Sequence, residues 1–263
     1  MSRKIEPKEQ LEEVDERERA FWNEMLDSDA AKLKMTDAYV GLSPYGLCQI
    51  ELLGSLNGKK VLELGCGSGD WAIRLALLGA EVFAIDVSDE AVTLTLRRAA
   101  ICNVADKVKA QRMSVYAMDF DTASFDFIHG TNILHHLNCA RAGLELRRVL
   151  RPVVGKAIFQ ENSSRNPLLM LGRKLCGHFG IPKWSSDDEY PLRKSDIKAI
   201  KSPFKGARSY YPEFQFFFYI NVKFFGYRNK RVSRICTSLD NFIFKFLPFL
   251  RSYSYHQILE LYT

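Results

Sequence analysis

The most constraining feature of the sequence is a run with glycine at alternate positions, Glu63-Leu64-Gly65-Cys66-Gly67-Ser68-Gly69. The apolar residues before it predict a strand, and the apolar residues at 71–78 predict a helix. Side chains at such a junction would keep a ligand off the backbone, so the glycines indicate a ligand lying against the turn. Asp86 ends the next predicted strand, 17 residues after Gly69, where a carboxylate can reach ribose hydroxyls. This pattern alone does not choose the ligand, and NAD remains an alternative.

Strands and helices alternate along residues 59–162. Further strands are predicted at 81–86, 107–112, 125–130 and 152–160, and further helices at 88–103 and 138–150. Each strand is too far from the next for a hairpin, so we expect a parallel α/β sheet with helices on both faces. Before this core, helices are predicted at 9–25 and 45–56. The expected organisation is an N-terminal helical cap (1–58), a cofactor-binding core (59–162), and substrate-side insertions with the final strands (163–263) in the same domain.

The run Val61 to Gly69 closely resembles the glycine motif of class I S-adenosylmethionine-dependent methyltransferases. The resemblance continues through Asp86, residues 124–128, Leu134-His135-His136-Leu137 and residues 147–152. Ordered matches over about 90 residues are more specific than one glycine loop. The resemblance implies a Rossmann-like, mostly parallel seven-stranded sheet, whose last two strands form an antiparallel pair near 207–211 and 255–261. It also implies S-adenosyl-L-methionine as the cofactor.

By the same resemblance, Glu63 would lie near the methionine amino group, Gly65 and Gly67 would pass the cofactor, and Asp86 would hold the ribose. A sulfonium cofactor with an ammonium group suits acidic partners, whereas a pyrophosphate would disfavour a carboxylate at position 63. The family's usual acidic contact to adenine is replaced by Ser114, whose hydroxyl can still accept a hydrogen bond. The expected cofactor-binding residues are Glu63, Gly65, Cys66, Gly67, Asp86, Val87, Ser114, Val115 and Thr131.

Methyl transfer from a sulfonium requires in-line positioning, and a general base only where the acceptor must lose a proton. His135 and His136 follow the fourth predicted strand, so either could be that base, although we favour a packing or orienting role for the pair. Glu161 ends the fifth predicted strand and ranks equally with His136. No metal site is expected, because the six cysteines lie singly, without the close pairs of a zinc site.

The net charge of +6 is unevenly distributed along the chain. Residues 1–150 carry 18 Lys and Arg against 23 Asp and Glu, a balance of −5, whereas residues 151–263 carry 19 against 8, a balance of +11. Two amphipathic helices within residues 214–250 would present aromatic and basic groups together, as in a segment that contacts an anionic membrane peripherally. A lid over the substrate, with its aromatic side chains inward, is an equal alternative. The acidic first half disfavours nucleic acid.

The sequence therefore predicts a methyltransferase that acts on a small or lipid-like acceptor, most readily at oxygen. One alternative is a non-catalytic cofactor-binding adaptor at a membrane or partner, and a less favoured one is an NAD-dependent oxidoreductase. A cytoplasmic location, with or without membrane association, is expected because no stretch is apolar enough to span a bilayer. The first 19 residues also lack the apolar core of a signal peptide.

Overall fold

The computed structural model describes Glu16, residues 34–175 and residues 190–263. Apart from Glu16, the predicted helix at 9–25 lies outside the described residues, and so does much of the expected N-terminal cap. The first half of the core contains α2 (Pro44–Leu53), β1 (Lys60–Leu64), α3 (Asp70–Leu77), β2 (Glu81–Asp86), α4 (Asp89–Ile101), β3 (Val108–Arg112) and β4 (Phe127–Thr131). It is followed by η2 (Leu134–His136), α5 (Cys139–Val149), β5 (Lys156–Asn162), α6 (Pro167–Leu175), α7 (Lys194–Lys201), β6 (Gly206–Tyr210), α8 (Phe217–Phe225), α9 (Lys230–Phe246), η3 (Pro248–Tyr253) and β7 (His256–Tyr262).

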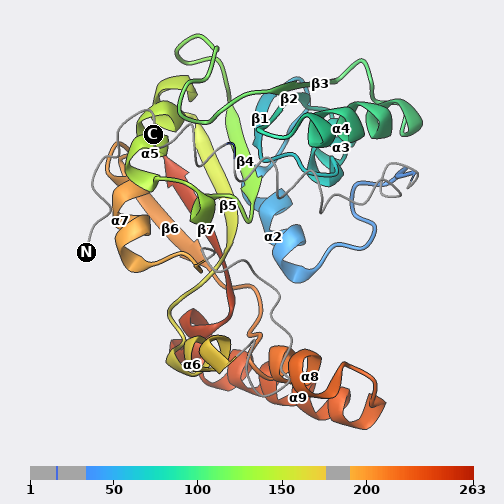
Figure 1. Ribbon diagram of the computed structural model, residues 1–263, viewed down its shortest axis with the longest axis vertical. Helices are drawn as coiled ribbons and strands as arrows, with labels where there is room; N and C mark the ends of the chain where they lie inside the picture. Colours follow the sequence, from blue (N-terminus) through green and yellow to red (C-terminus); the bar gives the residue numbers. More distant parts are fainter. Residues whose placement is uncertain (1–15, 17–33, 176–189) are drawn as a thin grey trace.

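The strands form one seven-stranded sheet in the order β3-β2-β1-β4-β5-β7-β6 (Figure 1). Neighbouring strands are parallel except at β7, which runs antiparallel to both β5 and β6. This confirms the predicted Rossmann-like fold, including the final antiparallel pair. Because the chain order reverses between β1 and β4, a crevice is expected at the carboxyl ends of these strands.

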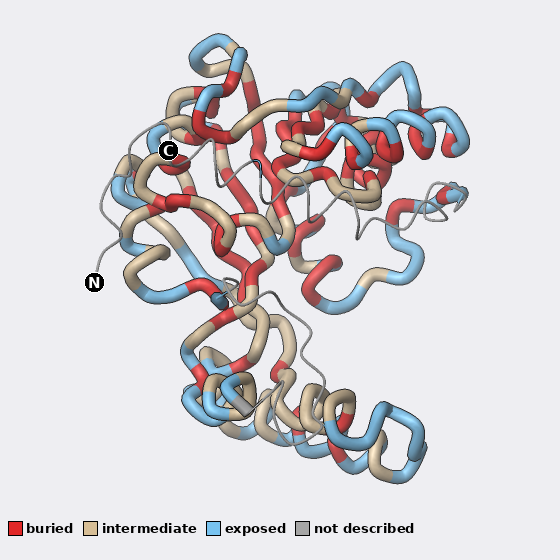
Figure 2. Tube along the Cα trace, viewed as in Figure 1, coloured by how far each residue is buried: buried red, intermediate tan, exposed pale blue. Residues whose placement is uncertain are grey.

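Both faces of the sheet are buried, as expected when helices cover a parallel sheet on both sides. Successive residues of β1 point to opposite faces, so Val61 packs with the cluster of α2, α3 and α4. Leu62 and Leu64 pack with the cluster of α5 and α7 on the other face. Figure 2 shows the central strands as mostly buried between the two helical layers, whereas the edge strands β3 and β6 are largely exposed or half-buried.

Two predicted boundaries differ from the structure by more than two residues, both for local reasons. The fifth strand begins at Lys156 rather than at residue 152, because residues 151–155 form a turn in which the Gly155 amide donates to the Arg151 carbonyl at 3.0 Å. Helix α2 ends at Leu53 rather than at residue 56, because Gly54 takes a φ of +71° and closes the helix.

Helices α6, α8, α9 and the short η3 lie together beyond one end of the sheet, and we call this group the helical lobe (Figure 1). Helices α8 and α9 are the two helices predicted within residues 214–250. Within residues 34–175 and 190–263, no helix is long and apolar enough to cross a membrane.

Candidate active site

The three glycines of the β1–α3 turn all have positive φ, but their surroundings differ. A Cβ on Gly69 would lie 2.9 Å from the Thr95 Cα, and a Cβ on Gly65 would lie 2.9 Å from the Ile133 Cδ1. At Gly67, where φ is +50°, a Cβ would meet nothing within 4 Å. Internal packing therefore explains Gly65 and Gly69, whereas Gly67 borders open space that a ligand can fill.

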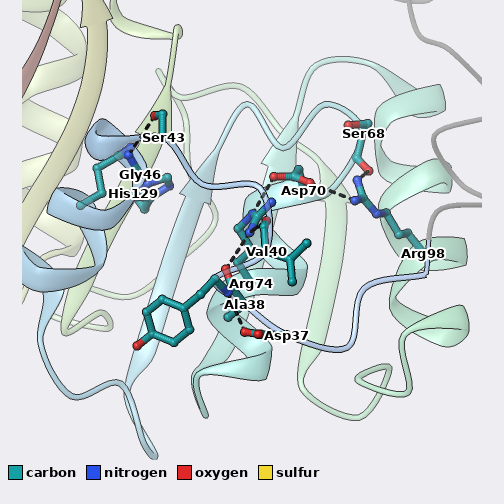
Figure 3. A network of polar contacts seen from close by, with 12 residues as sticks. Asp37, Ala38, Val40, Ser43, Gly46, Ser68, Asp70, Arg74, Arg98 and His129 are labelled. Atoms are coloured by element: carbon teal, nitrogen blue, oxygen red, sulfur yellow. Dashed lines mark hydrogen bonds and ion pairs between the residues drawn. The ribbon is translucent and has the colours of Figure 1, made fainter. Parts of the chain in front are cut away.

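A network of buried arginines fixes this turn (Figure 3). Arg98 donates to the Ser68 carbonyl at 3.2 Å and to the Asp70 carboxylate at 2.9 Å. Arg74 donates to the other oxygen of Asp70 at 2.8 Å and to the Ala38 carbonyl at 2.6 Å. The network thus ties the start of α3 and the segment before α2 to the glycine turn. The sequence analysis missed it, although Asp70 and Arg74 have the spacing of a helical ion pair.

Asp86 ends β2 directly beside the turn. One carboxylate oxygen accepts from the Gly67 amide at 3.0 Å, and the other accepts from the Ser88 amide at 3.0 Å. Burial raises the pKa of the Asp86 carboxyl, and the amide donors oppose this effect. A carboxylate offers about four acceptor positions, so Asp86 retains capacity for a diol.

The carboxyl ends of β3 and β4 add two hydroxyl groups to the same edge. The Met113 amide donates to the Asp86 carbonyl at 2.9 Å, which places Ser114 next to β2. The Thr131 hydroxyl is buried and has no hydrogen-bond partner within the described part of the chain. Because a buried hydroxyl without a partner is costly, Thr131 is suited to a polar group of a ligand.

Three other predicted cofactor contacts lie close to the turn but differ in what they present. The Cys66 side chain is buried against Thr95, whose hydroxyl lies 3.3 Å from the sulfur, so only its backbone can face a ligand. Val87 follows Asp86 and is partly exposed, whereas Val115 is buried in the core. Burial also raises the pKa of the Cys66 thiol, which keeps it neutral.

Glu63 belongs to a buried polar chain beneath the turn. Its Oε2 lies 2.7 Å from His129 Nδ1, and His129 Nε2 lies 2.7 Å from Gln49 Oε1. Gln49 in turn donates to the Gln160 side chain at 2.8 Å. The Trp71 ring packs on the His129 ring at a centroid distance of 4.3 Å. The sequence analysis missed His129, although a histidine inside an apolar strand was a signal.

The three candidate catalytic residues lie together at the ends of β4 and β5. Glu161 is fully buried, and its Oε1 accepts from the amides of Ile133 and Leu134 at 2.9 and 2.7 Å. Its Oε2 lies 2.7 Å from His135 Nδ1. His136 is partly exposed, and its ring packs on His135 at 4.2 Å. Glu161 and His135 therefore hold the η2 turn, and His136 is the accessible member.

A second polar cluster lies at this edge, where β7 begins. His256 pairs with Asn162, the last residue of β5. Its Nδ1 lies 2.7 Å from Gln215 Oε1, and the Tyr219 hydroxyl lies 3.3 Å from its ring. Burial lowers the pKa of His256 to about 4, so the ring is neutral near pH 7. This cluster was not predicted, because the antiparallel pairing of β7 places His256 beside β5, and Gln215 and Tyr219 reach it from 41 and 37 residues earlier in the chain.

The fold and the glycine turn with its carboxylate define a Rossmann-like nucleoside-binding domain. Residues 61–153 match a family model described as a methyltransferase domain. The chain therefore carries a class I S-adenosylmethionine-dependent methyltransferase domain, whose cofactor is S-adenosyl-L-methionine. The predicted family and cofactor are both confirmed. Within the described residues, no group of three His, Cys, Asp or Glu side chains could hold a metal ion.

Two curated relatives each match about half of the chain. A 27-O-demethylrifamycin SV methyltransferase of Amycolatopsis mediterranei is 28% identical over 50% of this chain and 46% of its own length. A ubiquinone biosynthesis O-methyltransferase of Alkalilimnicola ehrlichii is 29% identical over 56% of this chain and 60% of its own length. The chain thus spans about half the length of these relatives.

The solved structure of a geranyl diphosphate C-methyltransferase from Streptomyces coelicolor is similar to this chain over a larger share of both chains. It covers 94% of this chain and 96% of its own length, with a TM-score of 0.57 and 12% sequence identity. At this identity the similarity supports the fold and not the acceptor.

Proposed function

We propose that the protein transfers the methyl group of S-adenosyl-L-methionine to an oxygen of a small or lipid-like acceptor. The observation that carries the proposal is the pairing of Asp86 with the amide of Gly67, the one glycine of the turn that borders open space. The match over residues 61–153 supports the reaction class. Oxygen as the acceptor atom is supported by the name of the ubiquinone-related O-methyltransferase.

The residues at the carboxyl ends of β1 to β4 fit this cofactor. Asp86 would accept from the ribose hydroxyls, and the backbone of Gly65, Cys66 and Gly67 would lie along the cofactor. Ser114 would accept from the adenine amino group, with Val87 and Val115 beside the ring. The buried Thr131 hydroxyl, which has no partner among the described residues, would bond a polar group of the cofactor, and Glu63, held by His129, would lie below the methionine ammonium.

Bound there, S-adenosyl-L-methionine supplies a methyl group on a cationic sulfur. We assign to His136 the removal of the acceptor's hydroxyl proton, because it is the partly exposed member of the catalytic candidates, whereas Glu161 and His135 are buried. Glu161 and His135 act as positioning residues, since their polar atoms hold the η2 turn that carries His136.

The cluster of His256, Tyr219 and Gln215 lies at the edge where an acceptor would approach. A neutral imidazole beside a tyrosine hydroxyl recognises a polar group without requiring charge, which suits a hydroxylated aromatic or lipid-like acceptor. This cluster is therefore the proposed acceptor side of the site.

The experiment is methyl transfer from radiolabelled S-adenosyl-L-methionine to small-molecule and lipid extracts. The wild-type chain should label an extractable product, and His136→Gln should lower the label while leaving S-adenosylhomocysteine binding unchanged. A control is Asp106→Asn, an exposed carboxylate that precedes β3 and so lies at the opposite end of that strand from the site, which should retain full transfer. Cofactor binding without transfer to any fraction would contradict the enzyme and favour the adaptor.

A further inference from the structure

A row of large apolar side chains faces solvent along α9. Ile235, Leu239, Phe242 and Phe246 are 60%, 40%, 54% and 58% exposed, and Phe249 in η3 is 71% exposed. Their spacing of four, three, four and three residues follows the helical repeat and places the four α9 residues on one face. We call these five residues the α9 stripe.

The packing of α9 uses a different face. Cys236 and Asp240 are buried, with exposures of 7% and 4%. The Asp240 carboxylate accepts from the amides of Phe216, Phe217 and Phe218 at 3.1, 3.0 and 2.8 Å, which caps the start of α8. The α8–α9 hairpin is therefore held together without the α9 stripe.

Within α9 itself, the exposed charged side chains are all basic. Helix α9 carries exposed basic side chains, and these are Lys230, Arg231, Arg234 and Lys245. Its single acidic residue, Asp240, is buried beneath α8. The helix thus combines an apolar stripe with a basic flank, which is the pattern of a helix lying in a lipid interface.

We propose that the α9 stripe and its basic flank dock on an anionic lipid bilayer, with α9 parallel to the surface. Each Lys or Arg near such a surface favours binding, and the aromatic side chains enter the headgroup boundary. A second copy of the chain fits less well, because a symmetric contact through this patch would bring like charges together.

The position of the lobe gives this docking a consequence for the rest of the molecule. The helical lobe lies off one end of the sheet (Figure 1). Tyr219 of α8 contacts His256 at the start of β7. A docked lobe would hold this edge near the bilayer. The lid alternative fits Phe214, which is buried, and Tyr219, which contacts His256, whereas the residues of the α9 stripe are exposed to solvent. Docking goes beyond the proposed reaction and does not depend on it.

The test is co-sedimentation of the full chain with vesicles of phosphatidylcholine, with and without phosphatidylserine. Wild type should bind only the vesicles that contain phosphatidylserine. Removing three charges from α9 should weaken binding on the order of 100-fold. The α9 variant is Arg231→Gln/Arg234→Gln/Lys245→Gln. A matched variant removes three exposed charges from α7 and should bind as wild type does. It is Lys194→Gln/Lys198→Gln/Lys201→Gln.

The apolar part of the surface is tested separately. Phe242→Ser/Phe246→Ser/Phe249→Ser should weaken binding roughly 10- to 100-fold. Its control, Leu144→Ser/Val154→Ser, replaces exposed apolar residues of the sheet domain and should have no effect. Melting temperature and S-adenosylhomocysteine affinity should stay unchanged in all four variants.

Three results would overturn the proposal. The first is no binding of wild type to the phosphatidylserine vesicles, and the second is an equal loss of vesicle binding in the α7 and α9 charge variants. The third is a dimer in sedimentation velocity that the triple-Phe variant abolishes. If the triple-Phe variant does not fold, the difference in vesicle binding between the two charge variants still tests the proposal. If wild type did not bind S-adenosylhomocysteine, that result would count against the proposed reaction alone. The two proposals can therefore fail separately.

Discussion

Replacing Gly67 with alanine should weaken cofactor binding far more than it weakens the fold. Gly67 has a φ of +50°, and a Cβ added at this position would have no neighbouring protein atom within 4 Å. Alanine in this left-handed conformation costs about 1 kcal/mol, with no added clash inside the protein. The new methyl group would occupy the space assigned to the cofactor.

A matched control separates backbone strain from ligand contact. Gly58 has a φ of +68° and an equally open Cβ position, but it precedes β1 and so lies at the opposite end of that strand from the turn. Gly58→Ala and Gly67→Ala should therefore each lower the melting temperature by roughly 2–4 °C. Only Gly67→Ala should raise the dissociation constant of S-adenosylhomocysteine, by at least about tenfold.

Isothermal titration and thermal melting of the two variants measure both quantities. Equal cofactor affinity in Gly67→Ala and wild type would refute the reasoning, because the methyl group cannot share its space with a ligand on the turn. Equal loss of affinity in both variants would show that backbone strain, and not ligand contact, governs binding.

Three further outcomes follow from buried polar groups. Glu161→Ala should destabilise the fold by about 2 kcal/mol, because the amides of Ile133 and Leu134 and the ring of His135 would lose a buried hydrogen-bond partner; chemical denaturation measures this, and an unchanged midpoint would contradict it. Asp240→Ala removes the cap of α8 and should speed hydrogen exchange within α8 but not within α5; equal rates in wild type and variant would argue against the cap. Burial lowers the pKa of His256 from 6.5 to about 4, so its contribution to stability is present above pH 6.5 and is lost on acidification towards pH 4. Denaturation midpoints of wild type and His256→Gln should diverge across that window, and parallel pH profiles would exclude this role.

The features that depend on neighbouring residues could be predicted from the sequence. The strand, turn and helix around Gly67 follow from local apolar periodicity and glycine spacing, and so does Asp86 at the end of the next strand. Helices α8 and α9 also follow from periodicity, whereas the face that each buries does not. The final antiparallel pair was predicted only from the resemblance to a family.

The features that depend on strand register could not be predicted. Glu63 meets His129 because these residues are paired across β1 and β4, and no local pattern sets that register. The Gln49 contact adds a third element from a helix earlier in the chain. His256 reaches the end of β5 only through the pairing of β7, and 94 residues separate it from Asn162.

The central claim is that the β1–α3 turn and Asp86 bind S-adenosyl-L-methionine. The most direct measurement is isothermal titration of the purified chain with S-adenosylhomocysteine, with NAD in parallel and with Asp86→Ala as the variant. The account predicts saturable binding of S-adenosylhomocysteine, no binding of NAD, and loss of binding in Asp86→Ala. Binding of NAD instead, or binding of S-adenosylhomocysteine that survives Asp86→Ala, would contradict it.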